Sequence, residues 1–198
     1  MKLFNFLACL LILASPILLP SCKEEKPLPV LGQKPISDFS FLNQDSVAIT
    51  NKTFGNKIYI ADFFFTSCTT ICPIMHRNMK DLYEDFQDRP ELMFLSHTID
   101  FKYDKPSALK RYAKKLGVDD GRWQFVYGSK DSVYTIAEKD YLVTVMEDST
   151  AKENYVHAGY FVLIDGKRQI RGVYDGTDDK QVAQLRKDIP VLLKEVKN

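Results

Sequence analysis

The segment KIYIADFFFTSCTTICPIMHRNM, residues 57–79, decides the fold of this chain. Its first part, 57–65, is almost continuously apolar and aromatic, which is typical of a central strand buried on both faces. From Pro73 onward the apolar residues recur at helical spacing. Cys68 and Cys72 lie where the strand gives way to the helix, so the sequence predicts a strand–helix junction that carries two thiols.

Strands and helices alternate on both sides of this junction. Apolar or alternating runs predict strands at 39–42, 46–50, 91–99, 123–128, 141–147, 155–165 and 170–176. Helical spacing and end signals predict helices at 73–86, 105–117, 129–139 and 177–196. We expect the last helix to bend or split at Pro190. This order indicates an α/β protein with a thioredoxin-like fold and insertions, in which helices flank a central mixed sheet.

The N-terminal residues are typical of an export signal. Lys2 precedes an apolar stretch, 3–19, that ends in small residues and a cysteine. The sequence LLPSC at 18–22 resembles a bacterial lipobox in which Cys22 is lipidated, although Pro20 is unusual at its position. The alternative is a cleaved secretory signal without a lipid.

These features divide the chain into three parts. We expect a signal peptide at 1–21, a lipid-anchored tether at 22–37 that contains three prolines, and a thioredoxin-like domain at 38–198. The mature protein would then be an exported lipoprotein, anchored in a membrane and facing the periplasm.

Composition and cysteine use narrow the function. The net charge of +1 and the absence of a Lys/Arg-rich tract give no support to nucleic-acid binding. Cys9 leaves with the signal and Cys22 carries the lipid, so Cys68 and Cys72 remain as thiols. A disulfide between them would close too small a loop to restrict the unfolded chain much, which favours redox or metal chemistry over a structural role.

The two cysteines could form one site with a histidine. A helix that starts near Cys68 would place both sulfurs at its N-terminus, where the helix dipole favours thiolates. A cation or a disulfide would relieve the repulsion between them. His157 precedes a strand that can lie beside 57–65. Two thiolates and one imidazole suit copper, as Cu(I) or Cu(II), and also accommodate zinc.

At this point the chain resembles the Sco/SenC family over about residues 36–189. The family motifs are found here as TSCTTICP at 66–73, TID at 98–100, WQFVYG at 123–128 and the late histidine His157.

The resemblance implies a thioredoxin-fold protein that delivers copper to, or reduces cysteines of, the CuA centre of cytochrome c oxidase. Cys68, Cys72 and His157 would be the copper ligands, and Cys68 and Cys72 would also be the redox pair. The implied partners are the oxidase subunit that carries the CuA site, a thioredoxin-like reductant and a copper donor.

The chain departs from the family pattern in two places. The stretch DFKYDK keeps Asp100 and Asp104 but lacks the usual proline and arginine. Asp62 stands where the family has an apolar or small residue, six residues before Cys68. Thioredoxins carry a buried, proton-handling acid at this offset, so Asp62 favours thiol–disulfide exchange. The alternative is a strand acid that reaches solvent or a neighbouring hydroxyl.

Three functions follow from these residues. The first is a copper-binding assembly factor, favoured by His157. The second is a thiol–disulfide oxidoreductase that reduces partner cysteines, favoured by Asp62. The third is a peroxiredoxin-like peroxidase, for which Thr66 is near but no arginine is obviously placed.

The remaining histidines and methionines have simpler interpretations. His76 follows Cys72 by four residues and could be a ligand on the same helix face, or else a partly exposed helix residue. We expect His97 at a strand edge or in a loop. Met75 and Met79 are expected in the helix core.

Overall fold

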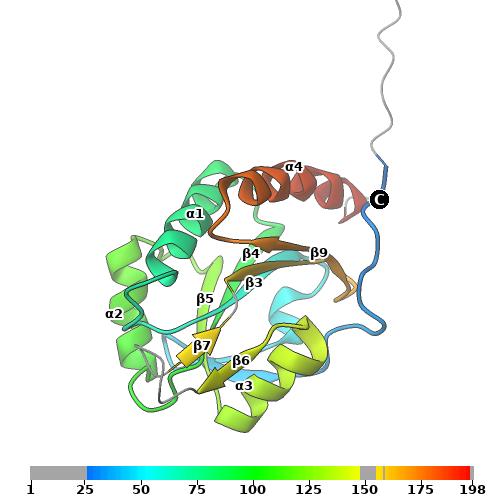
Figure 1. Cartoon of the computed structure of the whole chain (residues 1–198). Coiled ribbons are helices and arrows are strands. Elements are labelled where there is room, and N and C mark those ends of the chain that lie inside the picture. Colours follow the sequence, from blue (N-terminus) through cyan, green and yellow to red (C-terminus); the bar gives the residue numbers. More distant parts are fainter. Residues whose placement is uncertain (1–25, 148–154, 158, 197–198) are drawn as a thin grey trace, which may run out of the picture.

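The computed structural model describes residues 26–147, 155–157 and 159–196. Within them, a mixed seven-stranded sheet has the order β2-β1-β5-β4-β3-β8-β9 (Figure 1). Its strands are β1 (Ser40–Asn43), β2 (Ala48–Thr50), β3 (Ile58–Phe64), β4 (Leu92–Thr98), β5 (Trp123–Tyr127), β8 (Tyr160–Ile164) and β9 (Ile170–Asp175). A separate antiparallel pair is formed by β6 (Val145–Glu147) and β7 (Tyr155–His157).

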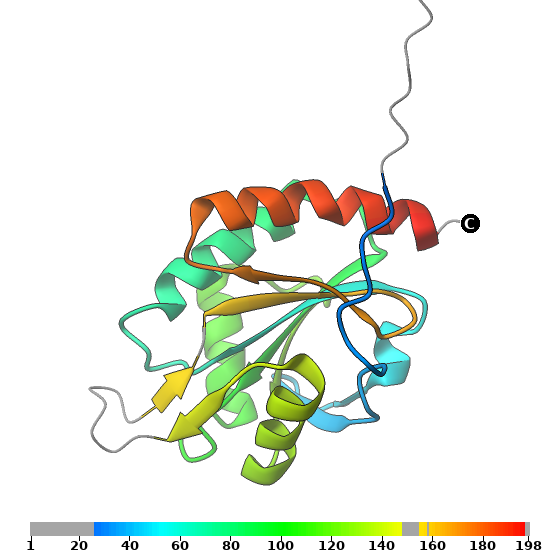
Figure 2. The same cartoon turned by 45° about the vertical axis from the view of Figure 1, so that its right-hand side comes forward.

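Helices cover both faces of the sheet, as expected for the α/β class. They are α1 (Cys72–Asp85), α2 (Pro106–Leu116), α3 (Lys130–Ile136) and α4 (Asp179–Val196), with a short 3-10 helix η1 (Asn51–Phe54) and a π-helical turn η2 (Ala137–Tyr141). α1 and α4 lie side by side on one face, where Arg186 of α4 forms an ion pair of 2.6 Å with Asp85 of α1. α3 lies on the opposite face (Figures 1 and 2).

The two central strands position the cysteine loop. β3 and β4 are parallel and buried throughout, with Asp62 paired to Ser96 in their register. The loop that leaves the end of β3 carries Cys68, and α1 begins at Cys72. α1 starts one residue before the expected position 73, and Pro73 occupies its first turn, where a missing N–H costs nothing. Cys68 lies in the loop before the helix.

Local end signals act as expected in the other helices. Gly117 ends α2 in the left-handed conformation, with φ of 72°. Ser129 caps α3, accepting a hydrogen bond from the Ser132 amide at 3.2 Å. α4 is a single helix that includes Pro190, so the expected split is absent.

Two expected strands differ from the structure, and tertiary packing explains the first. The run 141–147 forms a strand only at β6, because Tyr141 ends the turn η2 and is buried, with its hydroxyl 3.2 Å from that of Tyr59. Leu142 then reverses the chain with φ of 59°. The run 155–165 is divided into β7 and β8.

The segment before β1 packs against the domain. The amide of Leu31 donates to the carbonyl of Ile170 at 2.9 Å, and the amide of Ile36 donates to the carbonyl of Arg168 at 2.8 Å. Part of the expected tether is therefore attached to the hairpin of β8 and β9. Among the described helices, none combines the length and apolar character that a membrane crossing requires. Cys22 lies outside the described residues.

Candidate metal and redox site

The two thiols lie in and after the loop that joins β3 to α1. No disulfide joins Cys68 and Cys72, and both are buried, with 8% and 1% of their surfaces exposed. The amide of Cys72 donates to the sulfur of Cys68 at 3.4 Å. The Thr70 hydroxyl lies 3.6 Å from the same sulfur. The first amide of the helix thus points at Cys68, as expected for a sulfur at a helix N-terminus.

This geometry makes the two thiols unequal. The hydrogen bond to Cys68 and then burial raise the pKa of Cys72 well above its usual value. Cys72 therefore keeps its proton, while Cys68 receives a backbone donor and is the more exposed of the two. Cys68 is consequently the sulfur that an incoming metal or disulfide meets first.

A buried aspartate holds the start of the cysteine loop. One carboxylate oxygen of Asp104 accepts hydrogen bonds from the Thr66 amide at 2.8 Å and from the Thr98 hydroxyl at 2.7 Å, and the other accepts from the Thr66 hydroxyl. Burial raises the pKa of Asp104, and these donors oppose the rise. Asp100 shapes the adjacent turn by accepting from the amides of Lys102 and Tyr103. Asp104 therefore supports the cysteine loop, a role that sequence reasoning missed, whereas Asp100 shapes the neighbouring turn.

Asp62 and His76 form a buried pair behind the cysteines. Asp62 lies 2.9 Å from Nε2 of His76 and accepts the hydroxyl of Ser96 at 2.5 Å. Nδ1 of His76 lies 2.7 Å from the hydroxyl of Tyr112, and the indole of Trp123 donates to Ser96 at 2.9 Å. Asp62 is completely buried and reaches a hydroxyl and an imidazole rather than solvent.

This network corrects the interpretation of His76. The side chain is 1% exposed, so it is not a partly exposed helix residue. Both ring nitrogens are engaged by Asp62 and Tyr112, which leaves neither available to a metal ion. The sequence held one signal for this pairing, because an acid in a fully buried strand needs a hydrogen-bonding partner.

His97 also differs from its expected place. It lies inside β4, is completely buried, and pairs in register with Phe63. Its ring packs against Phe41, Phe63 and Tyr141, and neither ring nitrogen has a hydrogen-bond partner in the described part of the chain. Burial lowers the pKa of His97 to about 3, so the imidazole is neutral. His97 is a core residue, not a strand-edge or loop residue.

His157 ends β7, where its backbone pairs with Val145 of β6. Its side chain lies outside the described residues. Gly159 follows two residues later and packs on α1, since a Cβ at this glycine would lie 3.5 Å from Cδ1 of Ile71. Ile71 precedes Cys72 directly, so Gly159, the residue before β8, lies beside the cysteine loop.

Two consecutive hydrogen bonds connect α1 to Gly159. The side-chain amide of Asn78 in α1 donates to the carbonyl of Gly176 at 2.9 Å. The amide of Gly176 in turn donates to the carbonyl of Gly159 at 2.7 Å. Asn78 is a positioning residue that the sequence patterns did not reveal. Across the described side chains, no three His, Cys, Asp or Glu residues gather as a metal site.

Comparison with known proteins identifies the family of this chain. Residues 31–191 match the SCO1/SenC family. The chain is 26% identical to a SCO1 protein homolog of Bacillus subtilis over 156 residues, which is 78% of this chain and 80% of that protein.

Solved structures agree in fold. A SCO1/SenC family lipoprotein from Bacillus anthracis is 26% identical, with a TM-score of 0.73, and the match covers 84% of this chain and 99% of that one. BsSco, a member of the Sco family of cytochrome c oxidase assembly proteins, is 24% identical, with a TM-score of 0.71 over 85% of this chain and 96% of that one. Arabidopsis thaliana ScoI, solved with copper bound, has a TM-score of 0.67 at 19% identity, covering 83% and 99% of the two chains. This chain therefore belongs to the SCO1/SenC family and has its thioredoxin-like fold.

Proposed function

We propose that this protein binds copper through Cys68, Cys72 and His157 and acts as an assembly factor for cytochrome c oxidase. In this role it delivers copper to the CuA site or keeps the cysteines of that site reduced. The observation that carries the proposal is the placement of the two thiols, with Cys72 at the start of α1 and its amide donating to the sulfur of Cys68 in the preceding loop. Membership of a family with copper-bound members supports it.

The difference in burial and pKa between the two thiols suggests the order in which they bind copper. Cu(I) is a soft ion that prefers thiolate ligands, and Cys68 is the sulfur better prepared to bind it. Binding through Cys72 as well requires release of the proton that Cys72 holds. A partner dithiol can then take over the ligands one at a time. Oxidation of the two copper-bound thiolates of Cys68 and Cys72 to a disulfide would pass two electrons to a partner disulfide, abolish both thiolate ligands and free the metal.

The site is proposed to work at a membrane surface in the cell envelope. The lipobox-like end of the leader supports lipidation of Cys22, and the Bacillus anthracis relative is a lipoprotein. Lipid chains on one cysteine would hold the domain near the membrane, where cytochrome c oxidase resides.

A second candidate is a thiol–disulfide oxidoreductase that reduces partner cysteines without carrying copper. The buried pair of Asp62 and His76 favours it, since these groups lie behind the cysteines and link to Tyr112 near the surface. In this reaction Cys68 attacks the partner disulfide, and Cys72 then displaces the reduced partner while its own proton leaves.

Anaerobic titration with Cu(I) against a competing chelator tests the proposal. The chain from Lys26 on, reduced beforehand, is compared with its Cys68→Ser and His157→Ala variants. Met146→Leu is the control, because Met146 is exposed on β6, opposite β7, and offers a thioether that could bind copper by itself.

We expect one tight copper ion per wild-type and Met146→Leu chain, and much weaker binding in the other two variants. Binding that is weak in the wild type, or indifferent to His157→Ala, would overturn the copper site and leave the dithiol reductase as the better function.

A further inference from the structure

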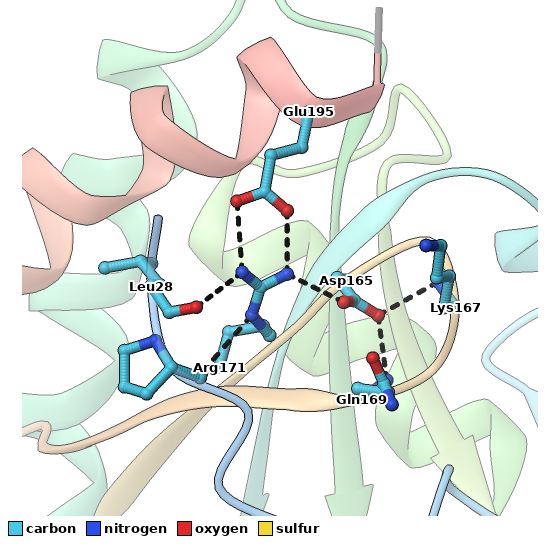
Figure 3. Close-up of polar contacts among 7 residues, drawn as sticks. Leu28, Asp165, Lys167, Gln169, Arg171 and Glu195 are labelled. Carbon is cyan, nitrogen blue, oxygen red and sulfur yellow. Dashed lines mark hydrogen bonds and ion pairs between the residues drawn. The ribbon is translucent and has the colours of Figure 1, made fainter. Parts of the chain in front are cut away.

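Arg171 joins the two ends of the described chain. Its guanidinium forms two hydrogen bonds with Glu195 in α4, at 2.8 and 3.0 Å, and one with Asp165 at 2.9 Å (Figure 3). It also donates to the carbonyls of Leu28 at 2.6 Å and Pro29 at 3.3 Å. These bonds use all five N–H groups of the side chain, which is 7% exposed. A buried guanidinium satisfied in this way is a rigid attachment point for the N-terminal segment.

The attachment continues along the segment from Leu28 to Ile36, which we call the docked segment. Backbone hydrogen bonds tie Leu31 and Ile36 to the hairpin of β8 and β9. Ile36 is 1% exposed and belongs to the core. The free part of the expected tether therefore ends near Leu28 rather than near residue 37.

The docked segment begins at the end of the molecule opposite the cysteines. Tyr59, near the start of β3, pairs with Ile164, and Asp165 follows directly. Cys68 follows the other end of β3, which has seven residues and is therefore roughly 20 Å long. Figure 2 shows this separation, with the N-terminal segment in blue and the end of α4 in red on one side, and the yellow strands β6 and β7 on the other.

We propose that the surface around the start of the docked segment rests on the membrane that holds the lipid of Cys22, so that the cysteine pair faces away from it. The proposal rests on lipidation of Cys22. Leu28 follows Cys22 by six positions in the sequence, and this length of chain spans about 20 Å when fully extended. A domain of this size is about 40 Å across, so this short connection does not let the far end reach the membrane. A tether free to residue 37 would span about 50 Å and would let the domain turn over.

The chemistry of this surface fits a lipid headgroup layer. Val30 and Leu31 are apolar and each is 49% exposed, although backbone bonds hold the segment in place. Lys26 and Lys167 are exposed nearby. Apolar side chains flanked by lysines are the combination that binds the surface of an anionic bilayer.

Energy transfer to labelled lipids tests the orientation. The full lipidated chain, with Cys68→Ser and Cys72→Ser, receives a single dye at Lys167→Cys or at Lys102→Cys. Both lysines are exposed, but Lys167 lies in the turn between β8 and β9, whereas Lys102 lies beyond the end of β4, near the cysteine loop. The proteins are placed in phosphatidylethanolamine–phosphatidylglycerol vesicles that carry an acceptor-labelled lipid.

We expect transfer from the dye at Lys167→Cys to be several-fold greater than from the dye at Lys102→Cys. Arg171→Gln should reduce this difference, whereas Arg186→Gln, which breaks a surface ion pair, should not. If Arg171→Gln fails to fold, a long Gly/Ser spacer between Glu25 and Lys26 should abolish the difference while leaving the Arg171 contacts intact.

Equal transfer from both positions, greater transfer from the Lys102→Cys dye, or failure of the chain to join vesicles would each overturn the proposal. These results are independent of copper binding, because both ligand cysteines are absent from the labelled proteins. Failure of the copper titration would likewise leave the orientation intact.

Discussion

Two buried histidines lie on opposite faces of strands β3 and β4, His76 in the helix α1 and His97 in β4 itself, and their surroundings differ. On the face covered by α1 and α2, His76 uses both ring nitrogens, with Asp62 on one side and Tyr112 on the other. On the other face, His97 lies among aromatic rings and neither nitrogen has a partner in the described residues. The same side chain is thus part of a polar network in one place and an apolar filler in the other.

The difference predicts which face could relay a proton. The network on the α1 face links a buried carboxylate to a half-buried tyrosine hydroxyl, close behind the cysteines. On the aromatic face, His97 has no hydrogen-bond partner among the described residues, and burial keeps its imidazole neutral by lowering its pKa. Chemistry that moves a proton to or from Cys72 is therefore expected to involve the α1 face.

The largest loss of stability should come from removing the carboxylate of Asp62, at the centre of the polar network. Asp62→Ala leaves Nε2 of His76 without a partner and the O–H of Ser96 without an acceptor, both buried, which should lower the free energy of unfolding by about 3 kcal/mol. Denaturant unfolding of the reduced protein measures this loss. Asp62→Asn is the matched control and should lose less, since its amide still offers a donor and an acceptor. Equal losses would show that the carboxylate's hydrogen bonds are not what stabilises this face.

On the aromatic face, the buried His97 should make the free energy of unfolding depend on pH. In the unfolded chain His97 takes up a proton below its ordinary pKa of about 6.5, whereas in the folded protein burial holds this pKa at about 3. The unfolded state therefore binds more protons as the pH falls from 6.5 toward 3, and stability declines over that window. His97→Phe removes this cost, so between pH 7 and pH 5 the variant should lose about 2 kcal/mol less than the wild type.

Urea unfolding of both proteins at the two pH values provides the measurement. Parallel losses in wild type and variant would contradict a neutral, buried His97. The comparison uses the change with pH and not the stability at one pH, because phenylalanine also alters the packing against Phe63.

The smallest effect is expected at the outer end of the polar network. Tyr112→Phe removes one hydrogen bond to His76 and keeps the ring that packs on Phe64. The free energy of unfolding should fall by about 1 kcal/mol. Tyr127→Phe is a useful control, because its hydroxyl bonds an exposed lysine rather than a buried group. A larger loss of stability in Tyr127→Phe than in Tyr112→Phe would contradict the view that the hydrogen bond to the buried His76 matters more than the bond to an exposed lysine.

Much of the fold could be predicted because its signals are local. The apolar run of β3, the proline at the start of α1, Gly117 at the end of α2 and the cap at Ser129 act through neighbouring residues. The cysteine pair at the strand–helix junction is local in the same sense. Binding of copper by Cys68, Cys72 and His157 stays a prediction, because the imidazole of His157 lies outside the described residues.

The sequence by itself determined the order of strands and helices and the position of two thiols at one junction, since spacing and end signals work over a single turn or strand. Only the tertiary structure decided what surrounds the buried polar groups. His76 in α1 finds its partner Asp62 in β3. The rings around His97 come from distant segments, and Arg171 holds Leu28 from the other end of the chain. A buried polar group takes whichever partner the packed chain brings within hydrogen-bond distance, and that choice depends on contacts no local pattern records.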